Sequence, residues 1–123
     1  YSPMPGVQLN GKLTLGENIG DLCGLTAAYD AYQKYAAANY PNGTPPVLDG
    51  FTGNQRFFLS FAQLWRYIGT PERIRQLATI DVHSPGEFRT HGTLPNFDPW
   101  YEAFGVTKDN ALYVPKDKRI QLW

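Results

Sequence analysis

Hydrophobic side chains recur at helical spacing along the first third of the chain. From about Leu15 to Asn39 they lie three or four residues apart, which places them on one face of an α-helix. This apolar stripe is made by Ile19, Leu22, Leu25, Ala28, Tyr29, Tyr32 and Ala36. Charged residues in the same stretch make it too polar to span a bilayer, namely Glu17, Asp21, Asp30 and Lys34. The pattern therefore predicts a long amphipathic helix that ends at Pro41-Asn42-Gly43.

Two further helices are predicted in the middle of the chain. The first runs from about Thr52 to Tyr67, and its apolar residues surround more than one face, as in a helix that packs on several sides. The second begins at Thr70-Pro71-Glu72, with Thr70 as the N-cap and Pro71 at the first helical position. Its apolar line is made by Ile74, Leu77 and Ile80.

Two short helices are predicted near the end. In Ser84-Pro85-Gly86-Glu87, the serine is placed to cap a helix and the glutamate is at the capping-box position, so Phe88 and Arg89 would lie on a short helical turn. Asp98-Pro99 would start a last helix through Phe104, which Gly105 stops.

The remaining segments lack helical periodicity. Residues 1–13 are rich in Pro, Gly and Asn and predict an extended lead-in, in which the alternating Val7, Leu9 and Leu13 permit one short strand. Residues 41–50 predict a loop and residues 106–123 an irregular tail. The fold class is therefore mainly α, with long loops and at most short strands. A length of 123 residues predicts one domain.

Composition and charge narrow the classes of partner. The 11 basic residues balance the 11 acidic ones, so we expect no nucleic acid and no anionic membrane as partner. The chain has no apolar run of membrane-spanning length and no leader-like start, so we expect neither an anchor nor a signal peptide in the chain as given. Aromatic residues make up 15%. Apolar helix faces left exposed could make this chain dimerise.

Cys23 is the only cysteine, so no intrachain disulfide is expected. Because it stands between Leu22 and Gly24 in the long helix, it is predicted to be a small core residue, with a reactive role as the alternative.

One pair of carboxylates stands out as candidate chemistry. Glu17 and Asp21 are four residues apart, so on a helix they share one face, one turn from each other. Such a pair can place one carboxylate on a metal ion and the other behind a neighbouring ligand. The alternative is structural: Thr14 and Glu17 fit a capping box, and acidic residues are favoured in a first helical turn without any function.

The sequence around this pair resembles the neprilysin and endothelin-converting-enzyme family of zinc metallopeptidases. Three blocks carry the resemblance in the family's order, together with the terminal Trp123: Asn10-Gly11-x-Leu13-Thr14-Leu15-Gly16-Glu17-Asn18-Ile19-x-Asp21 with the following Gly24-Leu25 and Ala28-Tyr29-x-Ala31-Tyr32, Phe58-Leu59-x-Phe61-Ala62-Gln63-x-Trp65, and Asp81-Val82-His83-Ser84-Pro85-Gly86-x-Phe88-Arg89. The resemblance covers essentially the whole chain. It implies that residues 1–123 form the C-terminal helical part of a thermolysin-like (gluzincin) catalytic domain.

The resemblance also implies a zinc site shared with sequence outside this chain. In the family, an H-E-x-x-H helix supplies two histidine ligands and the general base, and a second helix supplies a glutamate ligand. Glu17 matches that third ligand, and Asp21 matches the residue that orients a ligand histidine. The chain contains no H-E-x-x-H, since His83 and His91 are eight apart and neither has a glutamate beside it. We therefore expect no tight zinc binding and no peptide hydrolysis from this chain alone.

Four more residues take roles from the resemblance. His83 would donate a hydrogen bond to the oxyanion of the tetrahedral intermediate, and Arg89 would hold a substrate carbonyl and brace Asp21. Leu64 and Trp65 would line the pocket for the apolar side chain after the cleaved bond. Without the resemblance, these residues could have purely structural roles. His83 could be a loop histidine beside a helix start, and Arg89 a surface residue in an ion pair. Leu64 and Trp65 could be ordinary core residues. His91 matches no functional position and is predicted to lie in a loop.

The sequence thus predicts the C-terminal part of a zinc endopeptidase that acts on oligopeptides, completed by the missing N-terminal part of the same polypeptide. The alternative is a non-catalytic helical module that binds peptides on the same scaffold. A third possibility is an inhibitory or structural portion that pairs with another chain. Family members from secreted animal sources have a disulfide to the C-terminal tail, where this chain has Val106 and Ile120, which indicates a bacterial-type member. An extracytoplasmic location is favoured, with the cytoplasm left open.

Overall fold

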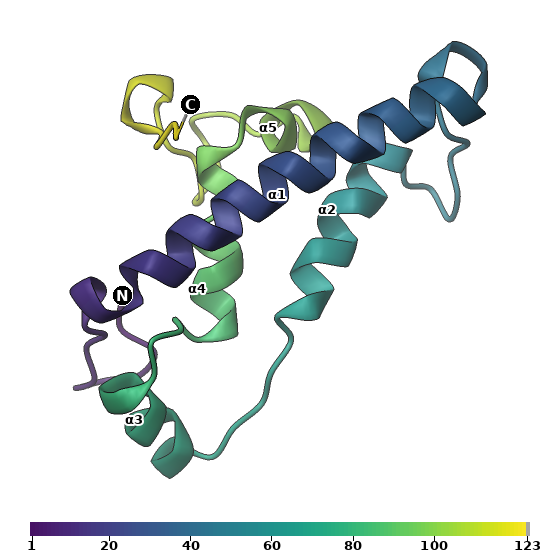
Figure 1. The fold of residues 1–123 in the computed structure, drawn as a ribbon. Coiled ribbons are helices and arrows are strands. Elements are labelled where there is room, and N and C mark those ends of the chain that lie inside the picture. The colour runs from purple at the N-terminus through teal and green to yellow at the C-terminus, as the bar shows by residue number, and fades with distance from the viewer. Residues whose placement is uncertain (123) are drawn as a thin grey trace.

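The computed structural model describes residues 1–122 and is mainly helical (Figure 1). Its α-helices are α1 (Gly11–Asn39), α2 (Gly53–Leu64), α3 (Pro71–Ile80), α4 (Gly86–His91) and α5 (Asp98–Phe104), and its 3-10 turns are η1 (Pro41–Gly43), η2 (Leu94–Asn96) and η3 (Lys116–Lys118). The described residues form only two isolated β-bridges, Met4–Val7 and Leu48–Phe51. The prediction of a mainly α fold is therefore confirmed.

Helix α1 starts four residues earlier than the apolar stripe predicted. The side chain of Asn10 accepts hydrogen bonds from the backbone N–H groups of Lys12 (3.1 Å) and Leu13 (3.3 Å), so it is the N-cap. Two predictions are wrong as a result. The strand permitted at Val7, Leu9 and Leu13 does not form, because Leu13 lies in the helix and no second strand pairs with the lead-in. The capping box at Thr14 is also absent.

The later helix starts show one confirmed and one wrong capping prediction. Thr70 caps α3 by accepting from Arg73 N–H at 3.3 Å, with Pro71 at the first helical position. Ser84 does not cap α4, because Pro85 is the N-cap residue and the Ser84 hydroxyl is buried without a hydrogen-bond partner in the described part of the chain. His91 is the last residue of α4 rather than a loop residue.

The core lies where the second half of α1 meets α2 and α5. Its buried members are Leu25, Phe58, Leu94, Trp100 and Tyr101. The ring of Tyr29 on α1 packs against three phenylalanine rings, at centroid distances of 5.2 to 5.4 Å. This packing holds α1 in place while its first half, which carries Glu17 and Asp21, extends beyond the core (Figure 1).

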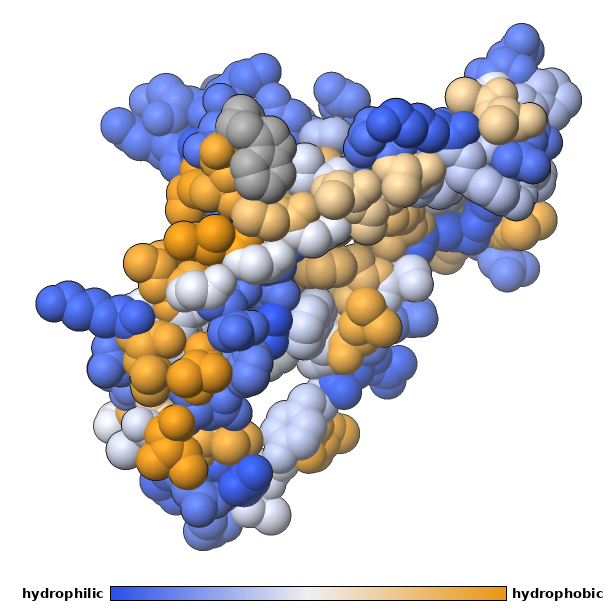
Figure 2. Space-filling view, viewed as in Figure 1, coloured by the Kyte–Doolittle hydropathy of each residue, from blue (hydrophilic) through white to orange (hydrophobic). Residues whose placement is uncertain are grey.

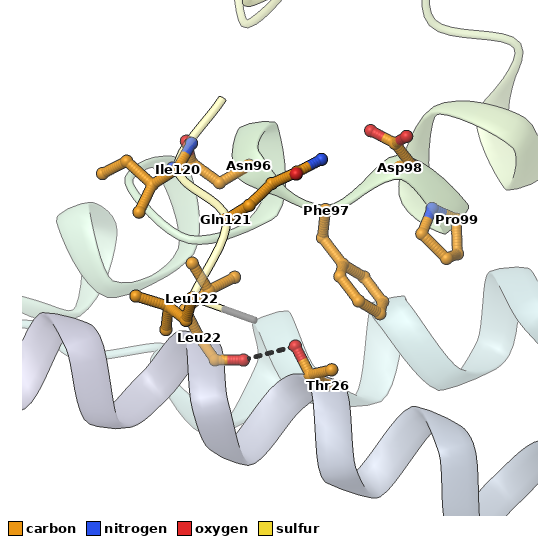
Figure 3. A pocket seen from close by; sticks show the side chains of 9 residues that line it. All are labelled: Leu22, Thr26, Asn96, Phe97, Asp98, Pro99, Ile120, Gln121 and Leu122. Atoms are coloured by element: carbon orange, nitrogen blue, oxygen red, sulfur yellow. Dashed lines mark hydrogen bonds between the residues drawn. The ribbon is translucent and has the colours of Figure 1, made fainter. Parts of the chain in front are cut away.

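The irregular tail is fastened to α5 and η2. The guanidinium of Arg119 lies 3.4 Å above the ring of Tyr101 and donates to Asp98 at 2.6 Å. The backbone N–H of Ile120 donates to the side chain of Asn96 at 2.8 Å. Figure 3 shows the tail beside α1, where it lines a pocket of about 240 Å³. The tail therefore closes over the start of the core.

The face seen in Figure 2 is not uniformly polar. Hydrophobic residues gather over the first half of α1 and toward α3, whereas the far end of α1 is mainly hydrophilic. Large apolar side chains that are more than half exposed include Leu15, Leu64, Ile68 and Ile80. Within residues 1–122, no helix is both long enough and apolar enough to cross a membrane.

We predict that the tail clamp weakens in acid. Hydrogen bonds from Arg119 and Lys116 lower the pKa of Asp98 below its ordinary value of about 4. A carboxyl with a lowered folded-state pKa contributes stability above its ordinary pKa, and this is lost as the pH falls through the lowered value. Asp98→Asn should therefore lower the unfolding free energy by about 1 kcal/mol at pH 7, because the half-exposed carboxylate is partly screened by solvent. The difference should shrink as the pH falls through the lowered folded-state pKa of Asp98.

The measurement is urea unfolding of the native chain and of the Asp98→Asn variant between pH 2.5 and pH 7. Asp117→Asn is the matched control, because that carboxylate is 72% exposed and lies 3.5 Å from Lys118. A stability difference for Asp98→Asn that stays constant across this pH range would contradict the clamp.

Candidate functional site

Glu17, Asp21, His83 and Arg89 lie together, although up to 72 positions separate them in sequence. Glu17 and Asp21 project from the first half of α1, His83 lies between α3 and α4, and Arg89 is on α4. The Glu17 Oε2 atom lies 3.3 Å from His83 Nε2 and 4.0 Å from Arg89 Nη2. The structure therefore brings together these four of the six site residues that the sequence analysis selected.

Asp21 and Arg89 form a two-pronged ion pair. Arg89 donates from Nη2 to Asp21 Oδ1 at 2.5 Å and from Nε to Oδ2. The two side chains are only 8% and 11% exposed, so each charge depends on the other for compensation. The hydrogen bonds to Asp21 raise the pKa of Arg89 above its ordinary value. This pair fixes α4 against the first half of α1.

Asp81 holds His83 in place, and the sequence reasoning did not select it. One Asp81 oxygen lies 2.8 Å from His83 Nδ1 and accepts the His83 backbone N–H at 2.9 Å. These two hydrogen bonds lower the pKa of Asp81. Because a carboxylate only accepts, Nδ1 carries a proton, and Nε2 is the nitrogen turned toward Glu17. The Asp-x-His spacing was the available signal for this orienting contact.

Leu64 and Trp65 end α2 beside these residues. Leu64 is 74% exposed, so it is not a core residue within this chain. The Arg89 guanidinium lies 4.1 Å from the centroid of the Trp65 ring. Both residues line a cavity of about 320 Å³ that Asp81 and His83 also line. An apolar wall thus adjoins the histidine.

The described residues could supply one ligand to a zinc ion, but not a complete zinc site. Glu17 is 44% exposed and offers a carboxylate oxygen, which is a zinc ligand type. Within residues 1–122, no group of three or more His, Cys, Asp or Glu side chains is placed to hold a metal ion. Cys23 is half-buried on α1 and adds no donor to such a group. Further donors would have to come from outside this chain.

Comparisons with known proteins agree in sequence and in structure. Residues 1–120 match the sequence model of peptidase family M13. Human endothelin-converting enzyme 1 is 46% identical and human neprilysin 44% identical, each over 118 residues. The zinc metalloprotease Zmp1 of Mycobacterium tuberculosis, solved in an open state, superposes over the whole chain with a TM-score of 0.90 and 40% identity.

These likenesses define the chain as a helical part of a peptidase domain. It belongs to peptidase family M13. The match covers 96% of this chain but only 15% of each human relative, and 100% of this chain but 19% of Zmp1. The terminal Trp123, which contributed to the sequence resemblance, lies outside the described residues.

Proposed function

We propose that the polypeptide containing this chain is a zinc-dependent endopeptidase that hydrolyses peptide bonds in oligopeptides. Membership of peptidase family M13 supports this, as does the similarity to Zmp1, which is named as a zinc metalloprotease. The observation that carries the proposal is the contact between the exposed Glu17 carboxylate and His83, beside the buried Asp21–Arg89 pair. If Glu17 and His83 formed only a surface ion pair, a second and buried ion pair would not be expected one turn further along the helix. The two pairs together are typical of a functional site.

Each residue has a chemical task in this proposal. Glu17 would be one zinc ligand, and Asp21 would accept a hydrogen bond from a ligand histidine supplied by the rest of the polypeptide. Zinc, when bound, supplies Lewis acidity toward water and the peptide carbonyl. His83, fixed by Asp81, would act as the imidazolium with a proton on both ring nitrogens, and would donate from Nε2 to the carbonyl oxygen as it gains negative charge. Arg89 would hold a substrate backbone carbonyl.

The role of Arg89 fits its remaining hydrogen-bonding capacity. Nε and Nη2 are occupied by Asp21, whereas Nη1 makes no hydrogen bond within the described residues. Because the guanidinium is planar and its position is fixed, Nη1 is a preorganised donor. The neighbouring cavity, with Leu64 and Trp65, would take an apolar substrate side chain.

Metal removal tests the proposal. The whole polypeptide is expected to bind one zinc ion per chain and to cleave an unstructured oligopeptide with apolar residues. Dialysis against a chelator should abolish cleavage, and added zinc should restore it. Zinc content by atomic emission and cleavage by mass spectrometry are the measurements. Peptide binding without zinc and without cleavage would instead support the non-catalytic peptide-binding module.

A further inference from the structure

The buried guanidinium of Arg89 has an aromatic neighbour as well as the carboxylates of Asp21 and Glu17. Asp21 accepts hydrogen bonds from Nε and Nη2, while the guanidinium carbon Cζ lies over the Trp65 ring, 4.1 Å from its centroid. An arginine over an indole face is attracted by the ring quadrupole, and more strongly when the pair is desolvated. With 11% of its side chain exposed, Arg89 is largely desolvated. The ring and the Asp21 carboxylate therefore hold the guanidinium from two sides.

The backbone places the Trp65 ring there by a close contact between two helix ends. Trp65 follows the last residue of α2, and Gly86 is the first residue of α4. A Cβ added at Gly86 would lie 2.1 Å from the Trp65 carbonyl oxygen, so only glycine permits this approach. Gly86 and Arg89 are one helical turn apart on α4. The contact at Gly86 therefore sets the distance between the ring and the guanidinium one turn further along.

We propose that Trp65 is a positioning residue for Arg89, and that its indole face keeps the Nη1 edge of Arg89 aimed at the substrate. This role differs from that of a pocket wall, because it acts through Arg89 and not through the substrate side chain. The expected effect of Trp65 on the rate of peptide hydrolysis rests on the proposed endopeptidase function. The ring–guanidinium contact itself is a property of this chain.

A double-mutant cycle in the whole zinc-loaded polypeptide tests the proposal. Trp65→Leu removes the aromatic face and is expected to lower kcat/KM about 10-fold, which is the scale of a desolvated cation–π contact. In an Arg89→Ala background, the same substitution should have almost no further effect. Trp65→Phe keeps an aromatic face and should retain most of the activity. Zinc content should be unchanged by Trp65→Leu and by Trp65→Phe.

Two outcomes would overturn the positioning role. The first is a loss from Trp65→Leu that is as large in the Arg89→Ala background as in the native one. The second is a loss that varies with the size of the apolar side chain after the cleaved bond, tested on peptides that differ only there. Either result would make Trp65 a pocket wall.

A second measurement does not depend on peptidase activity. Urea unfolding midpoints of this chain should fall with Trp65→Leu in the native background, but should change much less when Arg89 is already alanine. Equal shifts in both backgrounds would contradict the proposal even if the polypeptide were not a peptidase. Conversely, coupled midpoints in a protein without zinc or cleavage would refute the proposed function and leave the contact intact.

Discussion

Glu17→Gln in the whole polypeptide should remove bound zinc and peptide hydrolysis together, whereas His83→Ala should keep the zinc and lower kcat about 100- to 1000-fold. The amide of glutamine has nearly the shape of the carboxylate but lacks the charge that a zinc ligand provides. His83 has no ligand role in the proposal. Its Nε2 atom is 3.3 Å from Glu17 and is fixed by Asp81, so its loss removes only a hydrogen bond to the developing oxyanion.

The measurements are zinc per chain and steady-state kinetics on one oligopeptide. Asp30→Asn is the matched control, because it also removes a carboxylate from α1 but at a position that is 63% exposed and paired with Lys34. It should change neither zinc content nor rate. Equal zinc loss in Glu17→Gln and His83→Ala would contradict the division of roles, because it would make the histidine a ligand.

The elements of the fold followed from local sequence, and the errors have local causes. Thr70-Pro71 gave the start of α3 correctly, because cap and proline act within one turn. The start of α1 was misplaced because Asn10-Gly11 was counted with the irregular lead-in, although the asparagine side chain caps the helix. At α4, Ser84 had the right residue type, but Pro85 is the residue that leads into the helix.

The candidate site was predictable only in part. The one-turn spacing of Glu17 and Asp21 placed them on one helix face, but no periodicity could show that Asp21 meets Arg89, 68 positions away. That contact came from the family resemblance. The contact of Trp65 with Arg89 was not predicted, because it depends on the close approach of two helix ends at Gly86. Whether Glu17 binds zinc remains a prediction.

The tail shows a further limit of sequence reasoning. Residues 106–123 lack periodicity, and they do form an irregular segment with one 3-10 turn in the described part. Their attachment depends on Arg119 stacking on Tyr101 and on the Tyr101 hydroxyl, which donates to the Pro95 carbonyl at 2.7 Å. Such contacts bring together side chains that no local pattern links. These contacts arise from tertiary packing, so only the three-dimensional structure reveals them.

Arg89→Ala should destabilise this chain by about 3–5 kcal/mol, because it leaves the Asp21 carboxylate buried without a counter-charge. The Asp21 side chain is only 8% exposed, so water cannot replace the two lost hydrogen bonds without local opening. Adding Asp21→Asn to Arg89→Ala should recover part of the loss, since it removes the uncompensated charge. Urea unfolding at pH 7 measures each difference.

Lys34→Ala is the control for Arg89→Ala, because it breaks an ion pair on the same helix in which the lysine and aspartate are 76% and 63% exposed. Exposed pairs of this kind contribute about 0.2–1 kcal/mol, so its effect should be several-fold smaller. If the two substitutions had the same small effect, the Asp21–Arg89 pair would be an ordinary surface contact. It could not then hold α4 against the first half of α1, and the preorganisation assigned to Nη1 would be lost with it.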